Sequence, residues 1–321
     1  MVTLADIEQA QRRLAGTIVR TPLLPFGAAD ADGTTIYLKP ESLQPIGSFK
    51  IRGACNRIFD LSPEELQRGV IAYSSGNHAQ GVAFAAQRLG IKAVIVMPTN
   101  TPKVKIEATR RYGAEVVLYD PAQEKREDVA ARIMETDPYT LVPPFNDPHV
   151  IAGQGTVGLE IYQDLPDVDL VVVPIGGGGL ISGVATALKT LKPDVKIVGV
   201  EPELAADALA SFRGGHIVEM SAADTNRTIA DGVRTLKLGD LTFTHIQQYV
   251  DDIVTVTEAE IRAVTRRLVL EARLVVEPTA ALALAALLHH RAELPAARRA
   301  VAILSGGNID PIMLSELLAS A

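Results

Sequence analysis

Short apolar runs rich in β-branched residues alternate with helical patterns along most of this 321-residue sequence. Clear examples are "KAVIVMP" (92–98), "DLVVVPI" (169–175) and "KIVGVEP" (196–202), which are separated by segments with the apolar spacing of α-helices. Strands and helices that alternate in this way predict an α/β fold, in which parallel sheets carry helices on both faces. A chain of this length is expected to form two lobes around two cores.

Composition argues against several classes of function. The net charge of −7 disfavours nucleic acid as the main partner. The single cysteine, Cys55, allows neither an intrachain disulfide nor a thiolate metal site. No apolar run approaches the roughly 18 residues of a membrane span, and residues 1–16 have an amphipathic pattern without the apolar core of a signal peptide. We therefore expect a cytoplasmic protein with no nucleic-acid or membrane partner.

Glycines and polar residues gather where several predicted strands end. "SSGNH" (74–78), "GGGG" (176–179), Glu201 and "SGGN" (305–308) each follow the carboxyl end of a predicted strand. Open parallel sheets bind ligands in the crevice outside these ends. The sequence therefore predicts that these four segments contribute to one site.

The glycine run favours a phosphate group as part of the ligand. Four glycines before a helix let backbone N–H groups wrap an anion at the positive end of the helix dipole. No Gly-Lys-Ser/Thr follows, and the run does not fit a GxGxxG dinucleotide loop cleanly. A tight strand-to-helix turn is the alternative, although one or two glycines would be enough for it.

Hydroxyl and amide groups precede the helix that is predicted to begin near residue 77. Such a helix N-terminus binds a carboxylate readily. We expect Ser75 or Asn77 to cap the helix, and the second serine, Ser74, exceeds what capping requires. The Ser305 hydroxyl could contact a heteroaromatic nitrogen or simply form a turn.

The stretch "PIGSFKIRGA" (45–54) places a lysine at a predicted helix start. Gly47 and Ser48 suit a turn and an N-cap, so Lys50 falls in the first helical turn. The helix dipole and the apolar neighbours both lower the pKa of its amine, which suits imine chemistry. The alternative is a lysine whose amine reaches water past Phe49.

Two carboxylates six residues apart, Glu201 and Asp207 in "EPELAAD", carry oxygen ligands that suit a hard cation. Exposed carboxylates are common, so this spacing alone does not favour a metal site.

Taken together, the motifs resemble those of the fold type II enzymes that use pyridoxal 5′-phosphate, especially threonine/serine ammonia-lyases (dehydratases) and serine racemases. The resemblance spans nearly the whole chain, through "SFKIRGA", "SSGNHAQG", "PPFNDPHVIAGQGT", "VVVPIGGGG", "EPTAA" and "SGGN" in the family's order. Each motif is weak by itself, whereas the ordered set is specific.

The resemblance implies a role for each cofactor-binding residue. Lys50 would form the Schiff base, Phe49 would lie against the cofactor ring, and Asn77 would contact the ring's 3-oxygen. Ser305 would contact the pyridine nitrogen. The phosphate would be held by Gly176, Gly177, Gly178 and Gly179.

It also implies a substrate loop and a cation site. The substrate carboxylate would be received by Ser74, Ser75, Asn77 and His78, with Thr235 nearby. A divalent cation (Mg²⁺, Mn²⁺ or Ca²⁺) would be held by Glu201, Asp207 and the carbonyl of Ala205.

The implied architecture has two unequal lobes in a homodimer. Residues 1–58 and 148–321 would form the large domain, and residues 59–147 the small inserted domain. The implied activity removes the β-hydroxyl of L-threonine or L-serine and yields a 2-oxo acid and ammonia, with Lys50 as the base.

Alternatives remain open. One is a serine racemase with eliminase activity, in which Ser75 would be the second catalytic acid/base. Another is a threo-3-hydroxyaspartate ammonia-lyase. Outside this class, a dinucleotide-dependent oxidoreductase would leave Lys50 unexplained, and a silent carrier of the cofactor would release no 2-oxo acid.

Overall fold

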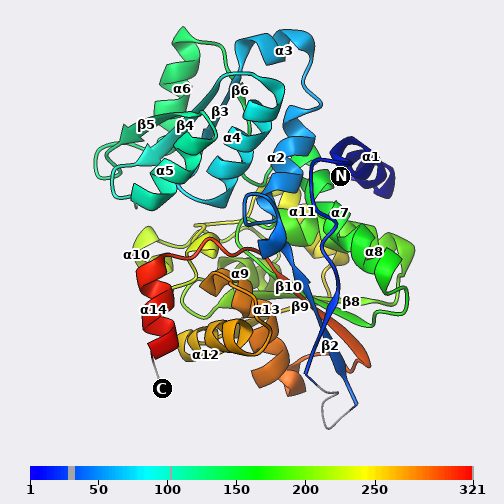
Figure 1. Cartoon of the computed structure of the whole chain (residues 1–321). Coiled ribbons are helices and arrows are strands. Elements are labelled where there is room, and N and C mark those ends of the chain that lie inside the picture. Colours follow the sequence, from blue (N-terminus) through cyan, green and yellow to red (C-terminus); the bar gives the residue numbers. More distant parts are fainter. Residues whose placement is uncertain (28–32, 102, 320–321) are drawn as a thin grey trace.

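The computed structural model describes residues 1–27, 33–101 and 103–319, which form two lobes, each built on one sheet (Figure 1). Within these residues the larger sheet has six strands in the order β1-β2-β10-β7-β8-β9, and the smaller has four in the order β5-β4-β3-β6. Every described pair of neighbouring strands is parallel except β1 and β2, which are antiparallel.

The larger lobe contains both ends of the described chain. Its strands are β1 (Leu24–Phe26), β2 (Thr35–Pro40), β7 (Leu170–Pro174), β8 (Lys196–Pro202), β9 (Asp252–Val256) and β10 (Arg299–Leu304). Its α-helices are α1 (Leu4–Leu14), α7 (Pro148–Asp164), α8 (Gly179–Leu191), α9 (Asp207–Gly214), α10 (Ala222–Thr225), α11 (Asp240–Tyr249), α12 (Glu258–Leu270), α13 (Pro278–His289) and α14 (Pro311–Ala319). Helix α2 (Lys50–Ile58) packs against both lobes, since it contacts α7 and shares a hydrophobic core with β3 and α4. Short 3₁₀ helices are η1 (Glu41–Leu43), η2 (Asp231–Val233) and η3 (Arg291–Glu293).

The smaller lobe is drawn in cyan to green at the top of Figure 1. Its strands are β3 (Val70–Tyr73), β4 (Ala93–Pro98), β5 (Glu115–Tyr119) and β6 (Thr140–Leu141). Its helices are α3 (Pro63–Arg68), α4 (Asn77–Leu89), α5 (Lys103–Arg111) and α6 (Arg126–Thr136).

Both faces of the larger sheet are buried, which explains its uninterrupted apolar strands. In β7, Leu170 and Val172 join the core that contains residues of α12 and α13. Val171 and Val173 point to the opposite face and join the core that contains residues of α7 and α8. The predicted α/β fold with helices on both sheet faces is thereby confirmed.

Three details of the strands were not evident from the sequence. The apolar run "YTLVPPF" (139–145) contains only the two-residue strand β6, since the prolines that follow have no N–H to donate to a sheet. The pair β1–β2 and the strand β9 were not predicted. In β2 the cause is Lys39, a charge that interrupts the apolar run although its side chain is fully buried.

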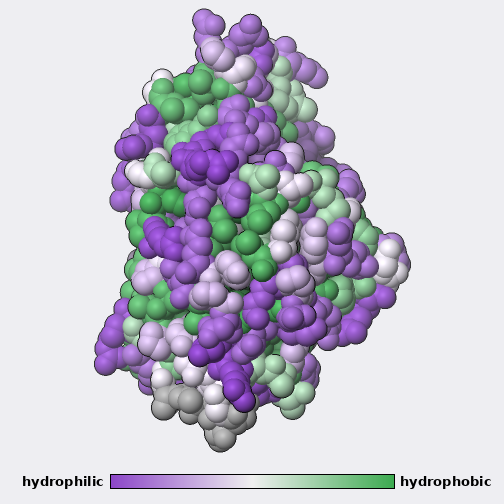
Figure 2. All heavy atoms as spheres, turned by 90° about the vertical axis from the view of Figure 1, so that its right-hand side faces the viewer, coloured by the Kyte–Doolittle hydropathy of each residue, from purple (hydrophilic) through white to green (hydrophobic). Residues whose placement is uncertain are grey.

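No helix in the described ranges is long and apolar enough to cross a membrane. Polar residues cover most of the side of the surface that Figure 2 shows, with smaller apolar areas between them.

Candidate active site

Lys50 is the first residue of α2, so it lies in the first helical turn as predicted. The prediction that Ser48 caps this helix is wrong. Phe49 occupies the N-cap position without a side-chain cap, and the buried Ser48 hydroxyl has no hydrogen-bond partner within residues 1–27, 33–101 and 103–319. The reason is that the Ser48 backbone forms an antiparallel bridge with Gly306, which ties the start of α2 to the loop after β10.

The Lys50 amine points into the protein. Its Nζ atom donates a hydrogen bond of 2.7 Å to the carbonyl of Pro144 and lies 5.3 Å from the centre of the Phe49 ring. Burial lowers the pKa of Lys50 to about 8, while the nearby Glu277 carboxylate acts in the opposite direction. The direction agrees with the sequence prediction, and the amine of this partly buried residue has a hydrogen-bond partner within the protein.

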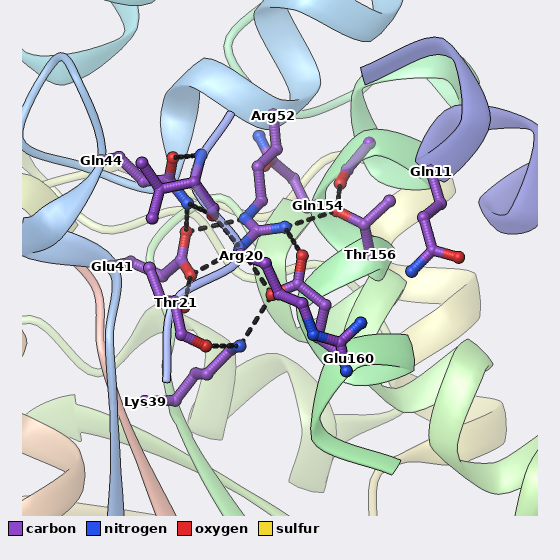
Figure 3. Close-up of polar contacts among 12 residues, drawn as sticks. Gln11, Arg20, Thr21, Lys39, Glu41, Gln44, Arg52, Gln154, Thr156 and Glu160 are labelled. Atoms are coloured by element: carbon purple, nitrogen blue, oxygen red, sulfur yellow. Dashed lines mark hydrogen bonds and ion pairs between the residues drawn. The ribbon is translucent and has the colours of Figure 1, made fainter. Parts of the chain in front are cut away.

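A buried charge network anchors α2 two residues beyond this lysine (Figure 3). The Arg52 guanidinium lies 2.7 Å from a carboxylate oxygen of Glu41 in η1 and 2.7 Å from one of Glu160 in α7. Lys39 in β2 also pairs with Glu160 at 2.7 Å. The network joins four elements and so fixes where α2 begins.

Ser305 and Asn77 lie close to this helix start. The Phe49 N–H donates to the Ser305 carbonyl at 3.1 Å, and the buried Ser305 hydroxyl has no hydrogen-bond partner among the described residues. Asn77, at the start of α4, donates from Nδ2 to Glu277 at 2.8 Å. Burial raises the pKa of Glu277 to about 8, and the charge of Asp231 adds to the shift.

The N-terminus of α4 has no side-chain cap, so the expectation that Ser75 or Asn77 provides one is wrong. Gly76 is the N-cap residue, and its N–H donates to the Ser74 hydroxyl at 3.3 Å. Ser75 is partly buried beside it. Since no side chain takes the first-turn N–H groups of this helix, they suit an anion such as a carboxylate.

His78, the next residue of α4, is buried, and its Nε2 atom lies 2.9 Å from the carbonyl of Val142. Burial lowers its pKa to about 3, and the charge of Lys50 adds to this effect. The imidazole is therefore neutral near pH 7.

Gly176, Gly177 and Gly178 connect β7 to α8, which also begins without a side-chain cap. A Cβ atom on Gly177 would come within 2.3 Å of the Phe145 ring, so only glycine fits there. Gly178 has φ +86°, a left-handed conformation that favours glycine. Gly179 begins the helix, and a Cβ on it would lie 3.0 Å from Cβ of Phe145.

Thr235 lies beside the glycine run. Its buried hydroxyl has no hydrogen-bond partner among the described residues and would lie 3.5 Å from a Cβ on Gly176. Phe145, which lies beside Gly177, follows Pro144, the residue whose carbonyl accepts from Lys50. The structure therefore brings together Lys50, the glycine run and Thr235 through neighbouring segments.

Glu201 and Asp207 are both fully buried rather than exposed. Glu201 lies within β8, not after it, and accepts from the N–H groups of Ala208 (3.0 Å) and Leu209 (2.7 Å). The Asp207 oxygens have no hydrogen-bond partner in the part of the chain that the structure describes, and burial raises the pKa of Asp207 to about 7. Burial and the charge of Asp207 raise the pKa of Glu201 well above its ordinary value.

Two buried acidic groups, of which Asp207 has unpartnered oxygens, have the ligand chemistry of a cation site. The described residues hold no group of three or more His, Cys, Asp or Glu side chains suited to a metal, so a third ligand would be a backbone oxygen such as the carbonyl of the buried Ala205. The hydrogen bonds described for Glu201 stay within β8 and α9 and do not join it to Lys50.

Three residues of this region, Phe145, Glu277 and Asn308, were not predicted to have a role. Glu277 lies directly before a proline at a helix start, and its acidic side chain between apolar neighbours was the available signal. Phe145 stood only within the motif "PPFNDPHVIAGQGT". Asn308 closes "SGGN", where only the serine received attention.

Comparisons with known proteins agree along nearly the whole chain. A family model described as "Pyridoxal-phosphate dependent enzyme" matches residues 14–306. The L-threonine ammonia-lyase of Thermotoga maritima is 48% identical over 320 residues, which cover 99% of this chain and 78% of that protein. The L-threo-3-hydroxyaspartate ammonia-lyase of Saccharomyces cerevisiae is 43% identical over 309 residues, covering 96% and 94%. Among solved structures, maize serine racemase matches with a TM-score of 0.92 and 38% identity over 98% of this chain and 96% of that one.

Proposed function

The chain belongs to the pyridoxal-phosphate dependent enzymes, and from this premise we propose that it is an ammonia-lyase for L-threonine or L-serine. It would remove the β-hydroxyl and the α-proton as water, and hydrolysis would then release a 2-oxo acid and ammonia. The observation that carries the proposal is the inward-pointing Lys50 amine, whose pKa is lowered to about 8 beside a glycine loop. Membership of this family confirms the resemblance drawn from the motifs and sets aside a dinucleotide-dependent oxidoreductase.

The described residues fit the cofactor. The Ser305 hydroxyl is buried without a partner among the described residues, and no side chain caps the N-terminus of α8 that follows the glycine run. We propose that Lys50 binds the cofactor covalently, that Phe49 lies against its ring and that Ser305 contacts its pyridine nitrogen. Asn77 would donate to the ring's 3-oxygen. The phosphate would be held by Gly176, Gly177, Gly178 and Gly179 at the uncapped N-terminus of α8.

When bound, pyridoxal phosphate supplies an electron sink for the pair left on the α-carbon after deprotonation. Lys50 would take the α-proton, and its lowered pKa keeps part of the amine neutral near pH 7. The uncharged Ser305 hydroxyl adds no negative charge beside the ring nitrogen. The substrate carboxylate would lie at the N-terminus of α4, received by Ser74, Ser75, Asn77 and His78, with Thr235 nearby.

Serine racemization is the second candidate, because Ser75 places a hydroxyl in the proposed substrate loop and maize serine racemase matches the whole fold. Ser75 would return a proton to the face of the α-carbon opposite Lys50. L-threo-3-hydroxyaspartate is a third substrate to test, since one similar protein bears that name.

We further propose that Glu201, Asp207 and the Ala205 carbonyl hold a divalent cation such as Mg²⁺, and that the enzyme works as a cytoplasmic homodimer. Titration with Mg²⁺, after a chelator has removed metal from the protein, tests the cation site. Sedimentation velocity tests the homodimer. A protein that binds no cation, or that sediments as a monomer, would contradict them.

The first experiment is a product assay on purified protein supplied with pyridoxal phosphate. L-threonine, L-serine and L-threo-3-hydroxyaspartate are incubated separately, with and without Mg²⁺, and 2-oxo acid release and the chirality of the remaining amino acid are followed. Release of 2-oxobutanoate from threonine without D-serine from serine supports the ammonia-lyase. D-serine that forms as fast as pyruvate supports the racemase, and no product from any substrate contradicts both.

Two variants assign the roles. Lys50→Ala is expected to abolish turnover, whereas Lys92→Ala on the surface of the smaller lobe should leave it unchanged. Ser75→Ala should slow D-serine formation more than 2-oxo acid release if Ser75 is the second acid/base. Equal rates of both products before and after this change would exclude that role.

A further inference from the structure

Asn308, the last residue of "SGGN", connects the backbone before α2 with the side chain of Asn77. Its Nδ2 atom donates to the carbonyl of Ile46 at 2.8 Å and to Oδ1 of Asn77 at 2.8 Å. Asn77 in turn donates from Nδ2 to Glu277 at 2.8 Å. The contacts form one chain, from Ile46 through Asn308 and Asn77 to Glu277.

The direction of this chain follows from its first member. A backbone carbonyl can only accept, so Asn308 must present its NH₂ group to Ile46. The other hydrogen of that NH₂ group points to Asn77, whose facing atom must then be the acceptor Oδ1. The NH₂ group of Asn77 is therefore turned away from Asn308, toward Glu277. A flipped Asn77 would set two donor groups against each other.

Backbone packing holds Asn308 in place. Gly47 has φ +73°, and a Cβ atom on it would come within 2.6 Å of the Asn308 side-chain oxygen. The Gly307 N–H donates to the Gly47 carbonyl at 2.8 Å, and the Glu277 N–H donates to the Gly306 carbonyl at 3.1 Å. The loop that carries Asn308 is thus bonded on both sides, to the turn before α2 and to the start of α13.

The NH₂ group of Asn77 has two hydrogens, of which Glu277 takes one. We propose that Asn308 is a positioning residue, which fixes the Asn77 amide so that its second N–H is offered to the bound cofactor. This inference rests on the proposed function, because it requires that Asn77 contacts pyridoxal phosphate. Asn308 itself acts only through Asn77.

Asn308→Asp tests the inference with a side chain of the same shape. The new carboxylate offers acceptors where Ile46 and Asn77 present oxygens, so Asn77 must turn its NH₂ group away from its present direction. We expect cofactor affinity to fall about tenfold, the effect of losing one hydrogen bond. The absorbance maximum of the bound cofactor and its pH profile should also shift, which a purely structural loss would not cause.

The measurement is titration of the cofactor-free protein with pyridoxal phosphate, followed by absorbance and fluorescence, with melting temperatures recorded in parallel. Asn56→Ala is the matched control, since Asn56 is a buried amide in α2. It forms hydrogen bonds with Arg13 and the His149 carbonyl and is not part of the series that runs from Ile46 to Glu277. The control should keep the wild-type spectrum. An Asn308→Asp protein with wild-type affinity and spectrum would overturn the inference.

A double-mutant cycle keeps the test decisive if Asn308→Asp folds poorly. In an Asn77→Ala background, Asn308→Ala should add no further loss of cofactor affinity, because its effect is exerted through Asn77. Fully additive losses would overturn the inference while the proposed function stands. A wild-type protein that binds no pyridoxal phosphate would instead overturn the proposed function itself, and the inference with it.

Discussion

Replacement of Arg52 by methionine should destabilise the protein strongly, although the volume of the side chain is nearly kept. Arg52 is fully buried and is the cation that pairs with Glu41. Without it, Glu41 keeps hydrogen bonds from Thr21 (2.7 Å) and Gln44 (3.1 Å) and the more distant charge of Lys39, but it loses the guanidinium that pairs with it directly. Glu160 retains Lys39. The change therefore leaves the buried Glu41 carboxylate without its ion-pair partner.

Removal of one partner from a buried ion pair costs about 3–5 kcal/mol. This is about two to nearly four powers of ten in the folding equilibrium. Lys39→Met should cost less, about 1–3 kcal/mol, because Glu160 remains paired with Arg52. Adding Glu41→Gln to Arg52→Met should restore part of the stability, since the stranded charge is then gone.

The pH dependence has a definite sign. Burial alone would raise the pKa of Glu41, but the charge and hydrogen bonds of Arg52 outweigh it and hold the pKa below its ordinary value. In the native protein this contribution is present above the unfolded pKa of about 4.3 and is lost as the pH falls through the folded pKa. Without Arg52, burial raises the pKa of Glu41, so the deficit of Arg52→Met should shrink as the pH is lowered from 7 toward 5.

Guanidinium chloride unfolding at pH 7 and pH 5 measures these differences in stability. The four proteins are the wild type, Arg52→Met, Lys39→Met and the double variant Arg52→Met with Glu41→Gln. The reasoning would be refuted by a loss below about 1 kcal/mol for Arg52→Met at pH 7, or by a double variant no more stable than the single one.

Two further predictions concern contacts near the site. Lys105 on α5 forms an ion pair with Asp231 in η2, and this pair joins the two lobes. Removal of either charge should raise KM about two- to fivefold. Exchange of the two residues should restore the wild-type KM. An exchanged protein with the KM of the single variants would contradict this role. Gly177→Ala places a Cβ within 2.3 Å of the Phe145 ring, so cofactor affinity should fall about tenfold. Wild-type affinity in a fluorescence titration would show that the ring moves without disturbing the loop.

Much of the fold could be predicted because strands that are buried on both faces appear in the sequence as continuous apolar runs. The strand β2 was not predicted because a lysine such as Lys39 is usually a surface residue. The burial of Lys39 is explained only by its ion pair with Glu160, which is distant in the sequence. Ser48 suits an N-cap by residue type, but its backbone pairs with a loop that lies some 250 residues further along the chain. Glu277 showed only that an acid stands between apolar residues, and its hydrogen-bond partner Asn77 lies 200 residues away in the chain. What the sequence could not supply in each case was a long-range partner.

The position of β10 between β2 and β7 has a consequence for synthesis on the ribosome. Thr34 and Ala297, which are hydrogen-bonded at this junction, are 263 residues apart in the chain. At about 5–20 residues per second, the edge of β2 that will pair with β10 waits tens of seconds for its partner. The β3–β6 sheet, whose strands span residues 70–141, is complete long before then. The smaller lobe can therefore fold early, while the larger lobe exposes an open strand edge, a site for chaperone binding or aggregation, until its last strand emerges.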